Sequence, residues 1–93
     1  MAAKFDWSKK KAAQNQRKHD VTFDEAKTVF DDAMLISFVD HEHSIDEERY
    51  ITIGMSLRGR LLMVAHTDRE EHIRIISARR AVKNEEKFYT DAN

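Results

Sequence analysis

The chain has 93 residues, a net charge of −1 and no cysteine. This length suits one small domain with a thin core, and the lack of cysteine excludes disulfides and thiolate zinc sites, which fits a reducing compartment. The longest apolar run, residues 61–65, is far shorter than the roughly 20 residues of a membrane span, and residues 1–7 lack the apolar region of a signal peptide. We therefore expect a single cytoplasmic domain over residues 1–93, with no membrane association.

Charge is distributed unevenly along the chain. Residues 1–19 carry six Lys or Arg and one Asp, for +5, whereas residues 20–48 carry ten acids and one lysine, for −9. Residues 49–80 carry seven arginines and three acids, for +4, and the remaining tail is −1. Because there is no overall basic bias, a nucleic-acid binder of this composition needs a local patch. The alternative is an ordinary soluble surface of mixed charge.

Two helices are predicted in the first third of the chain. Residues 9–19 are good helix formers that follow Ser8, a candidate N-cap, and their lysines form a basic flank. Thr22 and Glu25 have the spacing of a capping box, and four apolar residues follow at helical spacing: Phe23, Ala26, Val29 and Phe30. We predict the second helix over residues 22–31.

Beyond the second helix the pattern becomes that of β-strands. β-Branched, aromatic and aliphatic residues predict four strands, over 34–39, 49–54, 60–67 and 72–78. The connections at 55–59 and 68–71 are short and predict an antiparallel meander, whereas residues 40–48 form a longer polar loop. A last helix is predicted over residues 82–89. The predicted fold class is α+β, with two N-terminal helices, a four-stranded antiparallel sheet and a C-terminal helix.

The loop at residues 68–71 sets the expected register of the last two strands. A four-residue loop places Thr67 opposite His72, Ala65 opposite Arg74 and Met63 opposite Ile76, all on one face. Leu62, Val64, Ile73 and Ile75 then share the other, more apolar face, which we expect to meet the helices. Arg74 stands on the less apolar face, and two more arginines follow its strand. This junction is therefore predicted to hold a phosphate or a carboxylate.

Several strings resemble one family in order and spacing. FDWSKKKA, RKHDVTFDEAKTVFDD, ERYITIGMSLRGRLLMVAHTDR and IRIISARRAVKNEEKFY are similar to the BrnT toxins of bacterial type II toxin–antitoxin systems. The likeness covers roughly residues 5–89, and IRIISAR followed by Glu and Tyr is its most specific part. One departure is Asp20, where the family usually has Gly, although Asp tolerates left-handed backbone better than most residues. The resemblance implies a RelE-like ribonuclease fold and a BrnA-type antitoxin partner with a ribbon-helix-helix DNA-binding part.

RNA cleavage by attack of the 2′-hydroxyl needs a proton acceptor, a proton donor and cations that stabilise charge on the phosphate. No metal or other cofactor is required, because the guanidinium fork matches two phosphate oxygens. The catalytic candidates are Arg74, Arg79, His66 and Arg60. Each also has a structural interpretation: an exposed cross-strand partner for Arg74, a tie to Glu85 or Glu86 for Arg79, a structural role for His66 and solvated charge for Arg60.

Four further residues are candidates for RNA binding: Arg58, Arg80, Lys18 and Tyr89. Arg58 is equally consistent with a solvated turn, Arg80 with a partner of Glu85 or Glu86, and Lys18 with a solvated helix face. Tyr89 either belongs to the core or stacks on a base.

The sequence His41-Glu42-His43 also raises a metal-binding interpretation. We do not favour it, because no fourth ligand is evident and the stretch lies in an acidic loop. That loop is more typical of a surface that meets a basic partner or repels RNA from the wrong side.

These observations favour a metal-independent ribonuclease toxin that acts on single-stranded or ribosome-associated mRNA, inhibits translation and is neutralised by a BrnA-type antitoxin. Operator DNA is then expected to be bound only through the antitoxin. The alternative is a non-catalytic co-repressor module that binds and stabilises a DNA-binding antitoxin. A third interpretation is a structural domain without a nucleic-acid role.

Overall fold

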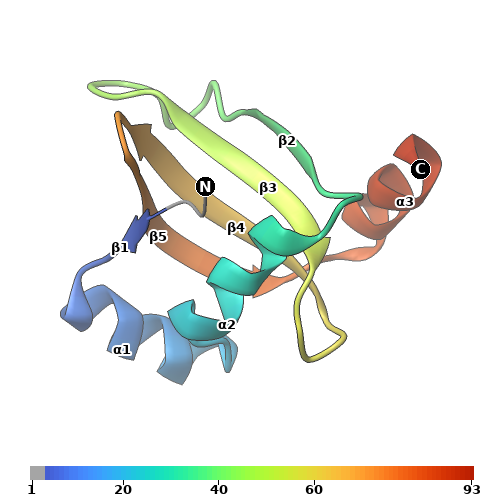
Figure 1. Cartoon of the computed structure of the whole chain (residues 1–93), viewed down its shortest axis with the longest axis horizontal. Helices are drawn as coiled ribbons and strands as arrows, with labels where there is room; N and C mark the ends of the chain where they lie inside the picture. Colours follow the sequence, from blue (N-terminus) through green and yellow to red (C-terminus); the bar gives the residue numbers. More distant parts are fainter. Residues whose placement is uncertain (1–3) are drawn as a thin grey trace.

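The computed structural model describes residues 4–93 and shows one five-stranded mixed sheet with helices beside it (Figure 1). The spatial strand order is β1-β5-β4-β3-β2. Along the chain the elements are β1 (Lys4–Asp6), α1 (Lys9–His19), α2 (Phe23–Lys27), the 3₁₀-helix η1 (Thr28–Asp31), β2 (Ile36–Val39), β3 (Arg49–Met55), β4 (Leu61–Arg69), β5 (His72–Arg80) and α3 (Lys83–Ala92).

The two N-terminal helices begin at the predicted caps. Ser8 Oγ accepts a hydrogen bond from the Lys11 N–H at 3.2 Å, and Thr22 Oγ1 accepts one from the Glu25 N–H at 3.0 Å. Helix α1 ends at Asp20, whose φ of 57° is left-handed, as an Asp at a helix end tolerates. The predicted second helix is divided into α2 and η1. Its capping box is half formed, because the Glu25 carboxylate binds Ser56 and Arg60.

The predicted antiparallel meander of β2, β3, β4 and β5 is present, but the four-stranded antiparallel sheet is wrong by one strand. The short strand β1 pairs in parallel with β5, with Phe5 opposite Ile73. Three residues are too few to show an alternating pattern. Their hydrogen bonds also depend on a partner nearly seventy positions away, which no local signal reveals.

The predicted register at the β4–β5 turn is wrong by two residues. Arg69 pairs with His72, so the turn consists of residues 70–71 and Thr67, not Ala65, is opposite Arg74. A shift of two keeps every side chain near the turn on its predicted face. A bulge next to Ala65 then inserts an extra residue in β5, and Met63 pairs with Arg79 in place of Ile76.

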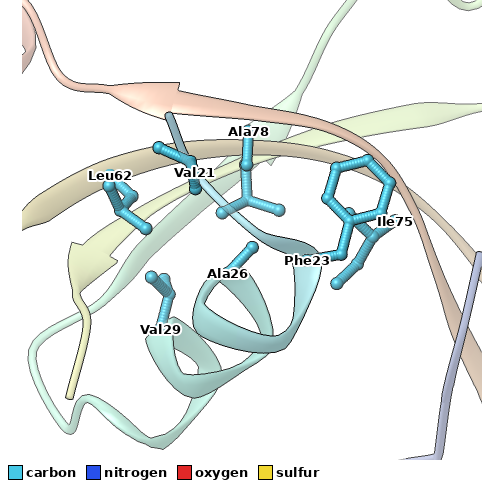
Figure 2. Close-up of a cluster of buried hydrophobic side chains, with 8 residues drawn as sticks. Val21, Phe23, Ala26, Val29, Leu62, Ile75 and Ala78 are labelled. Atoms are coloured by element: carbon cyan, nitrogen blue, oxygen red, sulfur yellow. The ribbon is translucent and has the colours of Figure 1, made fainter. Parts of the chain in front are cut away.

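The core lies between the N-terminal helices and one face of the sheet (Figure 2). It is formed by Val21, Phe23, Ala26, Val29, Leu62, Val64, Ile75 and Ala78, all at most 1% exposed. Phe5, Trp7, Ala12 and Phe30 are partly buried against it. Burial of these side chains supplies the main stabilisation, at about 25 cal/mol per Å² of apolar surface. Their distribution agrees with the predicted apolar face of β4 and β5.

The opposite face of the sheet, here called the open face, lacks this helical cover at its centre. The register places on it Arg49 and Ile51 of β3, Met63, Ala65 and Thr67 of β4, and Arg74, Ser77 and Arg79 of β5. Helix α3 stands away from α1 and α2 near the β2–β3 side of the sheet, where Phe88 lies 5.8 Å from Phe38 between ring centroids (Figure 1). Within residues 4–93 no helix combines the length and the hydropathy that crossing a bilayer demands.

Candidate active site

Two adjoining cavities lie over the open face. One, of about 370 Å³, contains Arg74 and Thr67, and the other, of about 410 Å³, contains Arg79 and Ser77. His43 and Arg49 line both cavities, so the two adjoin, and together they are here called the groove. The loop at residues 40–48 forms one wall of this groove, because Asp46 and Glu47 line the first cavity and Asp40 and Glu42 line the second.

A row of three side chains crosses the floor of the groove from strand to strand. Arg49 of β3 is opposite Thr67 of β4, and Thr67 is opposite Arg74 of β5. Neighbouring strands lie about 4.8 Å apart, so the two arginine Cα atoms are separated by roughly 10 Å with the threonine between them. The two arginine side chains therefore leave the sheet on either side of the threonine, on the face that carries the groove.

The Thr67 hydroxyl is the unusual member of this row. Thr67 is 3% exposed, and its Oγ1 is the buried side-chain polar atom that lacks a hydrogen-bond partner within residues 4–93. A buried hydroxyl without a partner lowers stability by about 1–3 kcal/mol, so such groups are rare and often mark functional positions.

Cations gather at the row itself, although the lining of the whole groove carries as many acids as bases. Arg74 donates one hydrogen bond to Asp6 Oδ1, at 3.1 Å, and its side chain remains 35% exposed. Since a guanidinium has five N–H donors, most of them are left for a ligand. The pKa of the Glu47 carboxyl is lowered first by the hydrogen bond from Arg69 and then by the charges of Arg69, Arg49 and Arg74. Those cations would favour any other anion in the groove in the same way.

Arg79 lines the groove but is bound to a carboxylate. Its two terminal nitrogens donate to the two oxygens of Glu85, each at 2.9 Å. Glu85 Oε1 also accepts the Val82 N–H at 2.9 Å at the start of α3. Burial acts to raise the pKa of Glu85, but the hydrogen bonds from Arg79 and Val82 outweigh it, and the pKa is lowered. Arg79 therefore ties α3 to β5, as the structural interpretation of this residue anticipated.

His66 does not reach the groove. It is 3% exposed on the core face, where its ring meets Phe30 edge-on at 5.0 Å. Both ring nitrogens are occupied, Nε2 with Thr52 Oγ1 and Nδ1 with Asp68 Oδ1, each at 2.7 Å. Burial lowers the pKa of His66, and Asp68 opposes that effect only in part. These contacts agree with the structural interpretation of His66 given in the sequence analysis.

Arg58 and Arg60 lie in the turn between β3 and β4 and belong to an ion cluster around Glu25. Arg60 Nε donates to Glu25 Oε2 at 2.9 Å, its Nη2 also contacts this carboxylate, and Arg58 Nη1 lies 3.5 Å from Glu25 Oε1. The hydrogen bond from Arg60 is the largest of the effects that lower the pKa of Glu25. This cluster joins α2 to the β3–β4 turn, and neither arginine lines the groove.

The remaining candidates are also outside the groove. Tyr89 Oη donates to Asp32 Oδ2 at 2.6 Å and so connects α3 to the segment after η1. Arg80 is exposed at the end of β5, opposite Leu62, and Lys18 is exposed on α1. Of the eight residues predicted from the sequence, the structure brings Arg74 and Arg79 to the groove.

Sequence reasoning missed Arg49, Thr67 and the histidine of the loop. Arg49 shares its face of the strand with Ile51 and Ile53, so no alternation singles it out, and no neighbour in the sequence assigns it a partner. In the sequence, His43 stands out only as a candidate metal ligand beside His41 and Glu42. Within residues 4–93 no group of three or more His, Cys, Asp or Glu side chains is arranged to hold a metal ion.

Comparison with known proteins identifies the family. The model of the ribonuclease toxins BrnT of type II toxin–antitoxin systems matches residues 7–85. The chain belongs to the BrnT family. This confirms the resemblance found in the sequence, and membership of a type II system implies an antitoxin partner.

The fold agrees with that of a solved BrnT structure. The ribonuclease toxin BrnT of Brucella abortus has a TM-score of 0.67 to this chain at 19% identity, covering 88% of this chain and 100% of that one. At this identity the likeness establishes the α+β fold that the two BrnT chains share. No curated protein matches the chain in sequence.

Proposed function

We propose that this BrnT family member is a metal-independent endoribonuclease toxin that cleaves RNA in the groove over its open face. Membership of the BrnT family gives the general class of protein, a ribonuclease toxin. The observation that carries the finer proposal is the row Arg49, Thr67 and Arg74, in which an unpartnered buried hydroxyl lies between two cations.

The row suits the phosphate at which RNA is cut. When the 2′-oxygen attacks phosphorus, negative charge accumulates on the two non-bridging oxygens. Two guanidinium groups and a hydroxyl that are already in place donate to those oxygens without reorganisation, which is the main way in which enzymes stabilise such states. Because a guanidinium group is always positively charged, these arginines can stabilise the negative charge on the phosphate without a metal ion.

The antitoxin is proposed to be of the BrnA type and to silence the toxin by covering the groove, while operator DNA is bound only through that antitoxin. Exposed apolar side chains support a partner surface here: Phe38, which lines the groove, is 40% exposed, and Phe88, which packs against Phe38, is 53% exposed. We propose a RelE-like topology, a cytoplasmic location and inhibition of translation through loss of mRNA.

The second candidate function is a non-catalytic co-repressor that only stabilises its antitoxin. One observation favours it: three groove arginines already have carboxylate partners, Asp6 for Arg74, Glu47 for Arg69 and Glu85 for Arg79. A groove neutralised in this way would hold RNA weakly.

RNA cleavage by purified protein in excess EDTA distinguishes the two functions. The toxin function predicts cuts that leave 5′-hydroxyl ends and that vanish when the 2′-hydroxyl at the cut site is replaced by hydrogen. Arg49→Ala and Arg74→Ala should abolish most cleavage, whereas Arg80→Ala, an exposed arginine outside the groove, should not. Intact RNA and unimpaired growth with soluble wild-type protein would favour the co-repressor.

A further inference from the structure

The row at the floor of the groove holds charge, but it contains no group suited to moving a proton. Arginine stays protonated at all physiological pH values, and a threonine hydroxyl is a very weak base. Attack by the 2′-hydroxyl nevertheless requires that its proton be accepted. If the proposed function is right, another side chain of the groove must supply that acceptor.

Imidazole is the side chain best suited to accept a proton near neutral pH, and the structure describes all five histidines. His66 is buried on the core face with both nitrogens occupied. His41 is exposed and lines neither cavity, and His19 and His72 lie at the end of α1 and the start of β5. His43 lines both cavities of the groove.

The position of His43 is held by contacts at the base of its loop. Its Nδ1 lies 2.8 Å from Asp40 Oδ2, and the Asp40 side chain is only 17% exposed although His43 is 60% exposed. Ser44 Oγ donates to the Asp40 carbonyl at 2.6 Å and accepts the Arg49 N–H at 2.9 Å. The Asp40 N–H in turn donates to the Arg49 carbonyl at 2.8 Å. The loop is thus closed at Arg49, the first member of the row.

The partner of Nδ1 determines what the other nitrogen can do. An ionised carboxylate only accepts hydrogen bonds, so Asp40 favours the tautomer with the proton on Nδ1. The Nε2 atom then carries a lone pair and acts as an acceptor. The same arrangement of carboxylate and imidazole orients the base in many hydrolases.

We propose that His43 is the general base of this ribonuclease and that Asp40 is its positioning residue; this rests on the proposed function. Nε2 takes the proton of the 2′-hydroxyl, and the freed electron pair of the 2′-oxygen forms a bond to phosphorus. The bond from phosphorus to the 5′-oxygen breaks, and that oxygen takes a proton from water. The products are a 2′,3′-cyclic phosphate and a 5′-hydroxyl, and His43 returns its proton to the resulting hydroxide.

The charged groups around His43 come from five elements and the loop itself. The cations of the groove are Lys11 of α1, Arg49 of β3, Arg69 of β4, and Arg74 and Arg79 of β5. The acids, besides Asp40, are Glu42, Asp46 and Glu47 of the loop and Glu85 of α3. A pH profile of cleavage therefore reflects several groups, and a test of His43 needs a readout that isolates one imidazole.

Chemical rescue with added imidazole tests the role of His43 separately from the other groups. His43→Gly should lower kcat by about 10²- to 10⁴-fold, and added imidazole should restore cleavage in proportion to its concentration. His41→Gly, two residues away in the same exposed loop, should cleave at the wild-type rate and should not respond to imidazole. A His43→Gly protein that cleaves normally, or one that is folded, binds RNA and shows no rescue, would overturn the proposal. Wild-type protein without cleavage would instead overturn the proposed function itself.

A second substrate distinguishes a role of His43 as general base from a role as general acid. RNA with sulfur in place of the 5′-bridging oxygen has a leaving group that needs no proton, so loss of a general acid is masked and loss of a base is not. His43→Gly should remain slow on this RNA, and recovery to the wild-type rate would overturn the assignment as base. Asp40→Asn should lower kcat by about tenfold or more with KM unchanged, because it acts only through the orientation of His43. An equal rise in KM would argue against that role.

Discussion

Arg79 and Glu85 form a two-pronged ion pair, with both N–O distances at 2.9 Å, that joins the last strand to the last helix. Helix α3 has no buried residue, so it depends on a few polar contacts of this kind. The pair is partly exposed, at 33% and 20% of the two side chains.

Loss of this pair should therefore loosen α3. Arg79→Ala is expected to lower the free energy of unfolding by about 1 kcal/mol, the upper range for an exposed pair, because two-pronged geometry strengthens it. Thermal unfolding and RNA cleavage should be measured on the same preparations. If Arg79 instead serves as a phosphate contact, cleavage will fall by about 10²- to 10³-fold while the melting temperature stays constant.

Thr67→Val should separate stability from activity. The substitution keeps the shape of the side chain and removes a hydroxyl that lacks a partner within residues 4–93, so the folded protein should be as stable as the wild type or more so. RNA cleavage should nevertheless fall, because the hydroxyl is proposed to donate to the phosphate. Denaturant unfolding and cleavage rates test both parts. A destabilised Thr67→Val protein with full activity would show that the hydroxyl has a structural partner.

Arg74→Ala should lower cleavage by about 10²- to 10³-fold, comparable to removal of one oxyanion donor. Lysine at this position should restore only part of the rate, since a point charge does not reproduce the fork of a guanidinium. Asp6→Asn is the matched control, because it removes the carboxylate that Arg74 contacts and leaves the arginine in place. It should retain or increase cleavage, and a loss as large as that of Arg74→Ala would assign the arginine a structural role.

Stability should depend on pH through His66. Its pKa is lowered by burial, so below about pH 6.5 His66 binds a proton in the unfolded chain but not in the folded chain. The free energy of unfolding should therefore fall as pH drops from about 6.5 toward the folded pKa. The lowered pKa values of carboxyls such as Glu25 matter only below about pH 4.5. Urea unfolding at pH 7.5 and 5.5 measures the difference, which should be absent in a folded His66→Gln protein.

Gly54 should not tolerate a side chain. A Cβ atom there would lie 2.8 Å from Val29 Cγ1, so Gly54→Ala forces β3 and η1 apart and should lower stability by about 1–3 kcal/mol. Double-mutant unfolding cycles with Val29→Ala should show a favourable coupling between the two sites, because the smaller residue makes room. Strict additivity would mean that the strain lies elsewhere.

The sequence by itself determined most of the elements and their approximate limits, the caps at Ser8 and Thr22 and the apolar face of the sheet, but not β1 or the division of the second helix. These are local properties, because a helix or strand repeats its pattern within a few residues. The family strings likewise lie in continuous stretches, so the BrnT resemblance was visible without a fold. The position of Arg74 on the open face also survived, since an error of two residues in register leaves the face unchanged.

Only the tertiary structure decided which residues meet. The pairing of β1 with β5 joins segments from opposite ends of the chain, and the true register depends on a two-residue turn and on a bulge near Ala65 that no local pattern specifies. The row Arg49, Thr67 and Arg74 exists because of that register. The same packing buries His66 and leaves His43 beside the groove, although the sequence offers both as imidazoles, because the sidedness of a strand and the path of a loop are set by contacts between distant residues.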